Sequence, residues 1–220
     1  MFSRYARSDG LLYGLEFLTD ENGRRVAAFS YWAGYAGTAI ALLSWAHQLL
    51  NVGKPQGPVP VFDTASALTD YESVLKWDMA ETASDGPFPE CRLSDLLVNC
   101  AYLDPHRIPP FVTHESLSAP GRRLRVICDV SCDPSENNPI PVYSGYSSFE
   151  NPTIATSPKI GSPELRVIAI DHLPTFVARE SSEEYSRLLL LSLLTLDLRD
   201  IEGVWKRAKQ TYRDRVKELP

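Results

Sequence analysis

Four short stretches of the chain, at residues 74–77, 95–103, 124–130 and 165–170, are largely apolar without a regular alternation of apolar and polar residues. A strand with one face in water alternates, whereas a strand covered on both faces reads as a nearly unbroken apolar run. Turn-rich sequence separates these stretches. We therefore expect an α/β fold built on a parallel sheet, with helices covering it.

The longest helical pattern covers residues 33–50, where Ile40 and Leu43 belong to an apolar series at helical spacing. Gly34 and Gly37 stand in its first turns. They lie far upstream of any nucleotide-binding signal, so we interpret them as sites of close helix packing rather than as a phosphate loop.

Both ends of the chain carry further local signals. Residues 11–17 and 25–30 flank an Asn22-Gly23 turn and are expected to form two strands, or a strand and a helix end. A short helix is expected at residues 113–117. Ser181-x-x-Glu184 matches a capping box opening a leucine-rich helix, and residues 201–219 predict an amphipathic, basic helix.

The charge balance and the cysteine content exclude several classes of protein. The chain carries 22 Lys+Arg against 28 Asp+Glu, a formal net charge of −6, which excludes a nucleic-acid binder that relies on bulk positive charge. No apolar stretch reaches the roughly 18–20 residues of a membrane span, and no apolar segment of a secretory signal follows the first residues. Four cysteines are too few for a disulfide framework in 220 residues, so we expect a cytoplasmic protein without a membrane partner.

Asp78 and His172 each follow an apolar stretch, at the place where open α/β sheets bind ligands. An acidic residue at the position of Asp78 accepts the ribose hydroxyls in dinucleotide-binding units, about 20 residues after a glycine-rich loop. Residues 59–71 contain no glycine, so that loop is missing here. His172 is equally compatible with a ligand contact and with a structural role. The histidines and cysteines show no metal-binding spacing, and no metal is expected.

A series of strings runs along almost the whole chain and carries a family resemblance. The strings are Leu12-Tyr-Gly-Leu-Glu-Phe17, Gly23-Arg-Arg-Val-Ala-Ala-Phe29, Ala33-Gly-Tyr-Ala-Gly37, Leu75-Lys-Trp-Asp-Met-Ala-Glu-Thr82, Gly86-Pro-Phe88, Val98-Asn-Cys-Ala-Tyr102, Cys128-Asp-Val-Ser131, Asn138-Pro-Ile-Pro-Val-Tyr143, Ile170-Asp-His-Leu-Pro174 and Val204-Trp-Lys-Arg-Ala208. Together they closely resemble the fungal saccharopine dehydrogenase family, the NAD-dependent, lysine-forming type within the alanine dehydrogenase and transhydrogenase-like superfamily.

The resemblance implies a truncated Rossmann-like sheet with flanking helices and a C-terminal helical segment. The family pattern begins with a domain of about 100 residues that holds its acid–base pair, and this sequence starts after it. The family's first nucleotide-domain strand and glycine-rich loop are replaced by the join between Tyr71 and Val74. We expect interdomain strands and the long helix at residues 1–50, an incomplete nucleotide-binding-like domain at 51–175 and C-terminal helices at 176–220.

Site residues follow from the resemblance, position by position. Glu16 is implied to tune pKa values near the reaction centre. The substrate site would include Arg25, Phe29, Asp171, His172, Leu173 and Pro174, and the NAD site would include Arg24, Asp78, Thr82, Tyr102, Val130 and the same Asp171, His172, Leu173 and Pro174. Core packing is the competing interpretation for Phe29 and Val130, and a plain surface position for Arg24.

The resemblance implies NAD-dependent oxidative cleavage of saccharopine to lysine and 2-oxoglutarate, in lysine biosynthesis through aminoadipate. The resemblance implies NAD as the cofactor, and the missing loop predicts that NAD binding is weak or absent. One alternative is a non-redox protein of secondary metabolism that binds a small molecule or processes an imine; another is a pseudoenzyme or an incomplete gene product. An amino-acid substrate is the expected small-molecule partner. The loss of a central strand also predicts a homo-oligomer, because it leaves an apolar sheet edge open.

Overall fold

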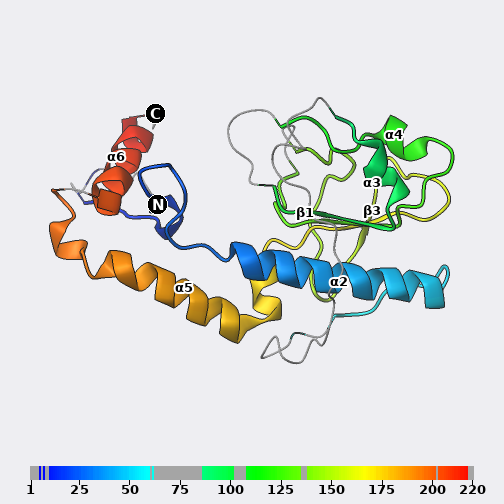
Figure 1. Ribbon diagram of the computed structural model, residues 1–220, viewed down its shortest axis with the longest axis horizontal. Coiled ribbons are helices and arrows are strands. Elements are labelled where there is room, and N and C mark those ends of the chain that lie inside the picture. Colours follow the sequence, from blue (N-terminus) through cyan, green and yellow to red (C-terminus); the bar gives the residue numbers. More distant parts are fainter. Residues whose placement is uncertain are drawn as a thin grey trace. The chain divides into compact units, whose positions relative to one another are not determined.

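The computed structural model describes residues 5, 7, 10–59, 61, 86–101, 108–134, 138–201 and 203–217, except for the side chain of Glu16 (Figure 1). The chain divides into two units. One, the terminal unit, joins residues 1–29 to residues 179–220, and the other, the sheet unit, comprises residues 30–178. The boundary expected at residue 50 lies at the end of the long helix, inside the sheet unit, whereas the units divide between Phe29 and Ser30 and between Ala178 and Arg179. No helix among the described residues combines the length and apolar character needed to cross a membrane.

The described part of the sheet has four strands in the order β1-β2-β4-β3. The strands are β1 (Leu96–Asn99), β2 (Val126–Asp129), β3 (Ile154–Ala155) and β4 (Arg166–Ile168). β1, β2 and β4 are parallel, whereas β3 pairs antiparallel with β4. The expected α/β fold with a mostly parallel sheet is confirmed, and the antiparallel strand was not predicted.

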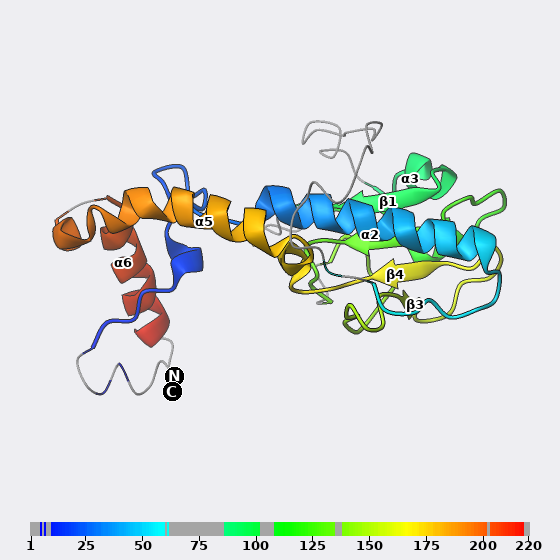
Figure 2. The same cartoon turned by 90° about the horizontal axis from the view of Figure 1, so that it is seen from below.

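Helices cover both faces of this sheet, with α2 (Ser30–Leu50) on one face and α3 (Pro89–Leu93) and α4 (His114–Ser118) on the other (Figures 1 and 2). Alternate residues of a strand point to opposite faces. Accordingly, Cys128 packs in the core beneath α2, while Ile127 packs in the core on the α3 and α4 side. All four residues of β2 are buried, which explains why its sequence does not alternate.

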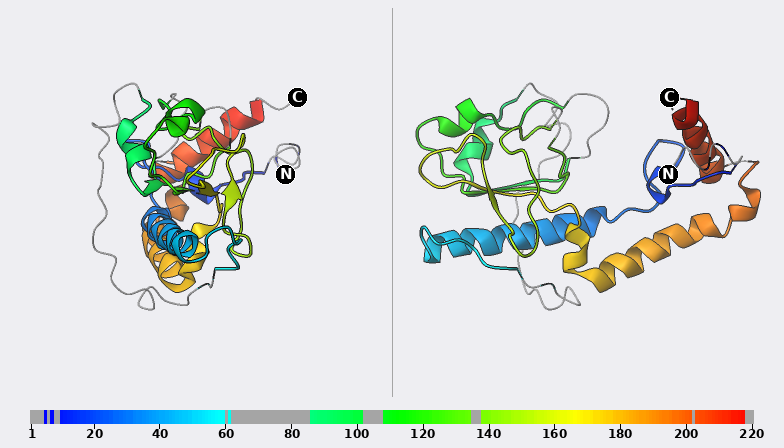
Figure 3. Two further views of the ribbon diagram at one scale, coloured as in Figure 1. Left: turned by 90° about the vertical axis from the view of Figure 1, so that its right-hand side faces the viewer. Right: turned by 180° about the vertical axis from the view of Figure 1, so that it is seen from behind.

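The glycines of α2 allow the helix to lie close to the sheet, which Figure 3 shows with α2 nearly end-on. A Cβ atom at Gly37 would lie 2.9 Å from Cγ2 of Val130 and 3.0 Å from Sγ of Cys128. At Gly34 it would lie 3.3 Å from Sγ of Cys100. The packing interpretation of both glycines is therefore confirmed, as is the predicted helix itself.

The strands are shorter than the apolar stretches that predicted them. Leu124 and Ile170 are fully buried, but they lie outside the ladders of β2 and β4. The apolar stretches thus mark the length of buried chain rather than the length of strand pairing. The stretch at residues 74–77 lies outside the described residues.

The predictions for the shorter helices had different outcomes. α4 is confirmed, with a capping box in which Thr113 Oγ1 accepts from the Ser116 N–H and Ser116 Oγ accepts from the Thr113 N–H. The capping box predicted at Ser181 is wrong, because α5 (Ala178–Leu193) begins three residues earlier and Ser181 is already helical and buried. The chain enters α5 directly from the 3-10 turn η4 (Leu173–Phe176), whose geometry sets the start of the helix.

The terminal unit contains η1 (Leu15–Phe17), α5, η5 (Leu196–Leu198) and α6 (Gly203–Lys217). Trp205 is at its centre, where its Nε1–H donates to the carbonyl of Ser192 (2.8 Å) and its ring packs edge-on against Tyr13. The expected strands at residues 11–17 and 25–30 are reduced to one antiparallel bridge, Thr19 to Arg25. The Asn-Gly turn between them is present, with Gly23 at a φ of 78°.

Candidate functional site

The parallel strands β1, β2 and β4 end at one edge of the sheet, and the segments that follow them form the candidate site. Open α/β sheets bind ligands at this carboxyl edge. Asn99 ends β1, Asp129 ends β2, and the chain after β4 continues through Asp171 and His172 into η4. The predicted residue Val130 directly follows Asp129.

Asp129 is a fully buried acid, and its hydrogen bonds tie the carboxyl edge together. Its Oδ1 accepts from Nδ2 of Asn99 (2.9 Å). Its Oδ2 accepts from Nδ2 of Asn138 (3.0 Å) and from the hydroxyl of Tyr143 (2.6 Å). Buried charge needs such donors, because its water of hydration has been lost. The carboxylate therefore joins β1, β2 and the segment that carries Asn138 and Tyr143.

Tyr143 is a hydrogen-bond donor in this network. Burial raises the pKa of Tyr143, and the negative charge of Asp129 raises that pKa further. The phenol therefore stays protonated and donates a hydrogen bond to the carboxylate. Asn138 completes the local geometry by accepting from the N–H of Ile140 (2.7 Å).

None of the four side chains in this network was assigned a role from the sequence. Asn99, Asp129, Asn138 and Tyr143 all lie in strings that carry the family resemblance. Two of them could have been found from the sequence, because Asn99 and Asp129 are single polar residues at the ends of apolar stretches. A buried polar side chain in such a position needs a hydrogen-bond partner.

His172 lies at the carboxyl edge with its ring exposed. The ring packs edge-on against Phe149, with centroids 5.2 Å apart. The His172 carbonyl accepts from the N–H (3.0 Å) and the Oγ1 (2.8 Å) of Thr175, which fixes the backbone at the entry to η4. Within the described residues the ring nitrogens make no hydrogen bond, so they are available to a ligand.

Two of the sequence-predicted site residues of the sheet unit meet beneath α2. Val130 and Leu173 both contact the position of Gly37, where a Cβ would lie 2.9 Å from Val130 and 3.4 Å from Leu173. Leu173 is 1 % exposed and belongs to the core, so its side chain supports the loop rather than facing a ligand. Asp171 is exposed at the same edge and Pro174 is partly buried.

The thiols near this edge are held in their protonated form. Burial raises the pKa of Cys132 to about 12, with further contributions from Asp129 and Asp171. Burial also raises the pKa of Cys128 and of Cys100. A thiol must lose its proton to act as a nucleophile, so these cysteines are unsuited to that role at neutral pH.

Arg24, Arg25 and Phe29 belong to the terminal unit. Asp20 Oδ1 accepts from the N–H of Arg24 (2.8 Å), which closes the turn. Arg24 and Arg25 are both exposed. Phe29 stacks on Tyr185 with ring centroids 4.4 Å apart and remains 40 % exposed, so it is not the core residue that the competing interpretation required.

The remaining predicted residues are Asp78, Thr82 and Tyr102, which lie outside the described residues, and Glu16, whose side chain does as well. No three His, Cys, Asp or Glu side chains gather as a metal site would need in the part of the chain that is described.

The glycines of α2 do not form a binding site for the pyrophosphate of a nucleotide. Such a cradle needs backbone that phosphate oxygens can approach, usually at glycines that open a helix. In α2 the corresponding space at Gly34 and Gly37 is filled by the side chains of Cys100, Cys128 and Val130. The two α2 glycines therefore do not hold the pyrophosphate of NAD.

The chain is similar in sequence to several known enzymes, although no family model matches it. It is 41 % identical to the saccharopine dehydrogenase [NAD(+), L-lysine-forming] of Schizosaccharomyces pombe over 263 residues, covering all of this chain and 71 % of that protein. The enzymes of the same name from Neurospora crassa and Emericella nidulans are 41 % and 40 % identical, again over the whole of this chain and about 70 % of theirs. Because the S. pombe match runs over 263 residues against 220 here, the relative holds internal residues that this chain lacks, in keeping with the expected internal omission. On this identity and coverage, the chain belongs to the family of NAD(+)-dependent, L-lysine-forming saccharopine dehydrogenases.

Proposed function

We propose that the protein acts in the oxidative cleavage of saccharopine, in which NAD accepts a hydride from the secondary amine and hydrolysis of the imine releases lysine and 2-oxoglutarate. The observation that carries this proposal is about 40 % identity over the whole chain to enzymes named for this substrate and cofactor. The carboxyl edge of a parallel sheet, the usual ligand site of such folds, supports it.

Arg25 is the proposed anchor for a carboxylate of saccharopine. Arg25 is an exposed residue that follows the Asp20–Arg24 turn, and a guanidinium can bind a carboxylate through two parallel hydrogen bonds. Phe29, stacked on Tyr185 and 40 % exposed, provides an apolar surface in the same unit for the aliphatic part of the substrate.

His172 is the proposed proton-exchanging group at the carboxyl edge. Its ring is held by Phe149 but keeps both nitrogens available among the described residues. Imidazole can accept or donate a proton near neutral pH, which the chemistry of an amine and an imine requires.

A second candidate function is binding of saccharopine, or of a similar amino dicarboxylate, without redox chemistry. The observation that favours it is the use of both α2 glycines for helix packing, which leaves them unavailable to a pyrophosphate. In this case Arg25 would bind a carboxylate of the ligand, and no hydride would be transferred.

One set of measurements on the full chain separates the two functions. The protein is incubated with saccharopine and NAD while NADH absorbance is followed, and saccharopine binding is measured separately by calorimetry. NADH formation above a no-enzyme control, with release of lysine, supports the dehydrogenase. Saturable saccharopine binding without NADH supports the second function. Failure of both measurements overturns both proposals.

A further inference from the structure

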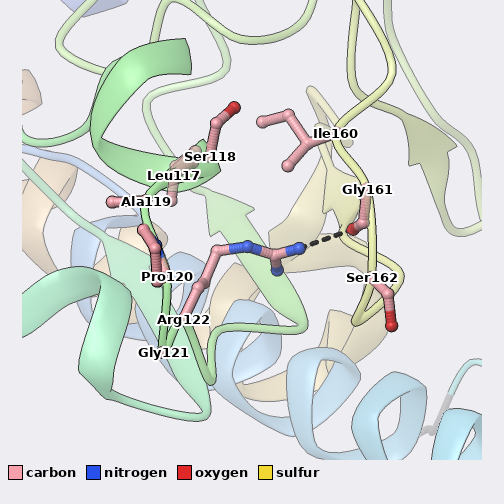
Figure 4. Close-up of a pocket in the computed structure, with 9 residues that line it drawn as sticks. All are labelled: Leu117, Ser118, Ala119, Pro120, Gly121, Arg122, Ile160, Gly161 and Ser162. Carbon is pink, nitrogen blue, oxygen red and sulfur yellow. Dashed lines mark hydrogen bonds between the residues drawn. The ribbon is translucent and has the colours of Figure 1, made fainter.

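A pocket of about 200 Å³ opens at the edge of the sheet opposite the candidate site (Figure 4). It lies between the end of α4 with the following turn and the loop before β4; its lining comprises Leu117, Ser118, Ala119, Pro120, Gly121, Arg122, Ile160, Gly161 and Ser162. Both lining segments precede strands, β2 in one case and β4 in the other. The pocket is therefore at the amino-terminal edge, away from His172 and Val130.

Arg122 reaches across this pocket from the turn toward Gly161 (Figure 4) and is only 7 % exposed. Its Nη2 donates to the carbonyls of Gly161 (2.6 Å) and Pro163, and its Nη1 donates to the carbonyl of Leu124. A guanidinium has five N–H donors, so Nε–H and one Nη1–H remain.

The charge of Arg122 has no carboxylate partner among the described residues. Three carbonyls supply partial negative charge, but they do not neutralise a full positive charge. Burial lowers the pKa of Arg122, and the nearby charge of Arg125 lowers it further. A buried cation is ordinarily balanced by an anion, because desolvation without a partner is costly.

Other charges around the pocket do not provide this anion. Asp95 forms an ion pair with Arg123, and Glu164 forms one with Arg166 at 2.8 Å. Arg92 adds a further cation, donating through Nη1 to the carbonyl of Pro120 (3.1 Å) in the pocket wall. Positive charge therefore gathers at this edge of a chain whose net charge is −6.

Neutral donors are also present at the rim. Ser118 and Ser162 line the pocket from its two walls, and the hydroxyl of neither makes a hydrogen bond within the described residues. Both hydroxyls point away from the Arg122 guanidinium in Figure 4, so each must rotate about its Cα–Cβ bond to reach an anion beside it. The N–H groups of Gly161 and Ser162 likewise donate to nothing there. Hydroxyl and amide donors around a guanidinium are the groups that bind phosphate oxygens in proteins.

We propose that this pocket binds a small phosphate-type oxyanion, held by Arg122 and by the hydroxyls of Ser118 and Ser162 once these side chains rotate toward it. The anion would supply the negative charge that Arg122 lacks and would link the turn after α4 to the loop before β4. The pocket is at the opposite edge from the candidate site, so the proposal does not depend on saccharopine or NAD binding.

The test measures phosphate binding to the full chain by calorimetry and follows the Arg122 Nε–H signal by NMR. Sodium chloride at equal ionic strength is the reference. Saturable binding with a shift of the Arg122 signal is expected in the wild type. Ser118→Asp and Ser162→Asp each place a carboxylate at the rim and should weaken binding at least tenfold. Ser144→Asp adds the same charge at an exposed site outside the pocket and should bind as the wild type does.

The anion series identifies the ligand class. Binding of glycerol phosphate as tight as that of inorganic phosphate supports a phosphoryl group carried by a larger molecule, and preference for inorganic phosphate supports the free ion. Acetate binding as tightly as phosphate overturns the assignment to phosphate-type anions. The absence of saturable phosphate binding, or equal binding by the Ser118→Asp and Ser144→Asp variants with native circular dichroism, overturns the site itself.

Discussion

The hydroxyl of Tyr143 donates a 2.6 Å hydrogen bond to Oδ2 of Asp129, a carboxylate that is fully buried at the end of β2. This bond joins a loop of the sheet unit to the carboxyl edge where the candidate site lies. It also gives Asp129 a structural role, because the acid is surrounded by donors from its own chain.

Removal of this hydroxyl should destabilise the protein without removing any core volume. Tyr143→Phe leaves one buried carboxylate oxygen short of a donor, which should lower the free energy of unfolding by about 1–3 kcal/mol. Urea denaturation followed by circular dichroism measures the change. Tyr146→Phe is the matched control, because Tyr146 is 61 % exposed and should change stability little. Equal effects of the two substitutions would contradict the structural role of the bond.

A methyl group at Gly37 should also destabilise the sheet unit. Glycine-to-alanine changes within helices ordinarily stabilise by about 1 kcal/mol. At Gly37 the new Cβ would lie 2.9 Å from Val130, which directly follows β2, and 3.0 Å from Cys128 in β2. The close contact should outweigh that gain and lower the Tm. Gly34→Ala, with its nearest contact at 3.3 Å, should be better tolerated. A higher Tm for Gly37→Ala would show that α2 can move away at little cost.

The sequence predicted those parts of the fold that rest on long apolar patterns. α2 and the parallel strands were expected because burial on both faces leaves a strong signal in residues such as Ile127 and Cys128. The two-residue strand β3 has no such pattern, since Ile154 is only partly buried and Ala155 is exposed. The start of α5 was misplaced because a local motif at Ser181 cannot report that the helix continues directly from η4.

Much of the candidate site followed from the family resemblance rather than from pattern. The sequence is equally compatible with a ligand contact and with a structural role for His172. The exposure of its ring beside Phe149 could be learned only from the structure. The network around Asp129 joins Asn99 to Asn138, which are far apart in sequence. Spacing along the chain cannot predict such a contact.

Arg25→Lys should weaken saccharopine binding while keeping the charge. Lysine cannot form the paired hydrogen bonds of a guanidinium with a carboxylate, so the loss should be about 1–3 kcal/mol. Calorimetry with saccharopine measures it. Arg187→Lys is the control in the same unit, because Arg187 is exposed and lies 3.6 Å from Glu184, an ion pair that lysine can keep. Unchanged affinity in Arg25→Lys would remove Arg25 from the substrate site.

NAD should bind only weakly. The space beside the α2 glycines is occupied by side chains, so phosphate oxygens gain no backbone donors there. Isothermal titration of the full chain with NAD is expected to give a Kd well above the micromolar range. Tight binding would show that residues outside the described part hold the cofactor.

Stability should fall in mildly alkaline solution because of the buried thiols. Burial raises the pKa of Cys91 and of Cys132 from 9.0 to about 12. Above pH 9.0 the unfolded chain loses these protons while the native protein keeps them, so the free energy of unfolding should fall as pH rises toward 12. Urea titrations on both sides of pH 9.0 measure the slope. Cys91→Ala should flatten it, and an unchanged slope would assign the effect to other groups.

The open edge of β1 should promote self-association. Within the described residues β1 pairs only with β2, so its other edge has no strand partner. Leu96, Leu97 and Val98 are only partly buried on this strand, and an apolar open edge favours pairing with a second copy. We expect a homo-oligomer at micromolar concentration with residues 96–98 near the contact, seen by light scattering over a dilution series. A monomer at every concentration, with a cooperative thermal transition, would mean that residues outside the described part cover this edge.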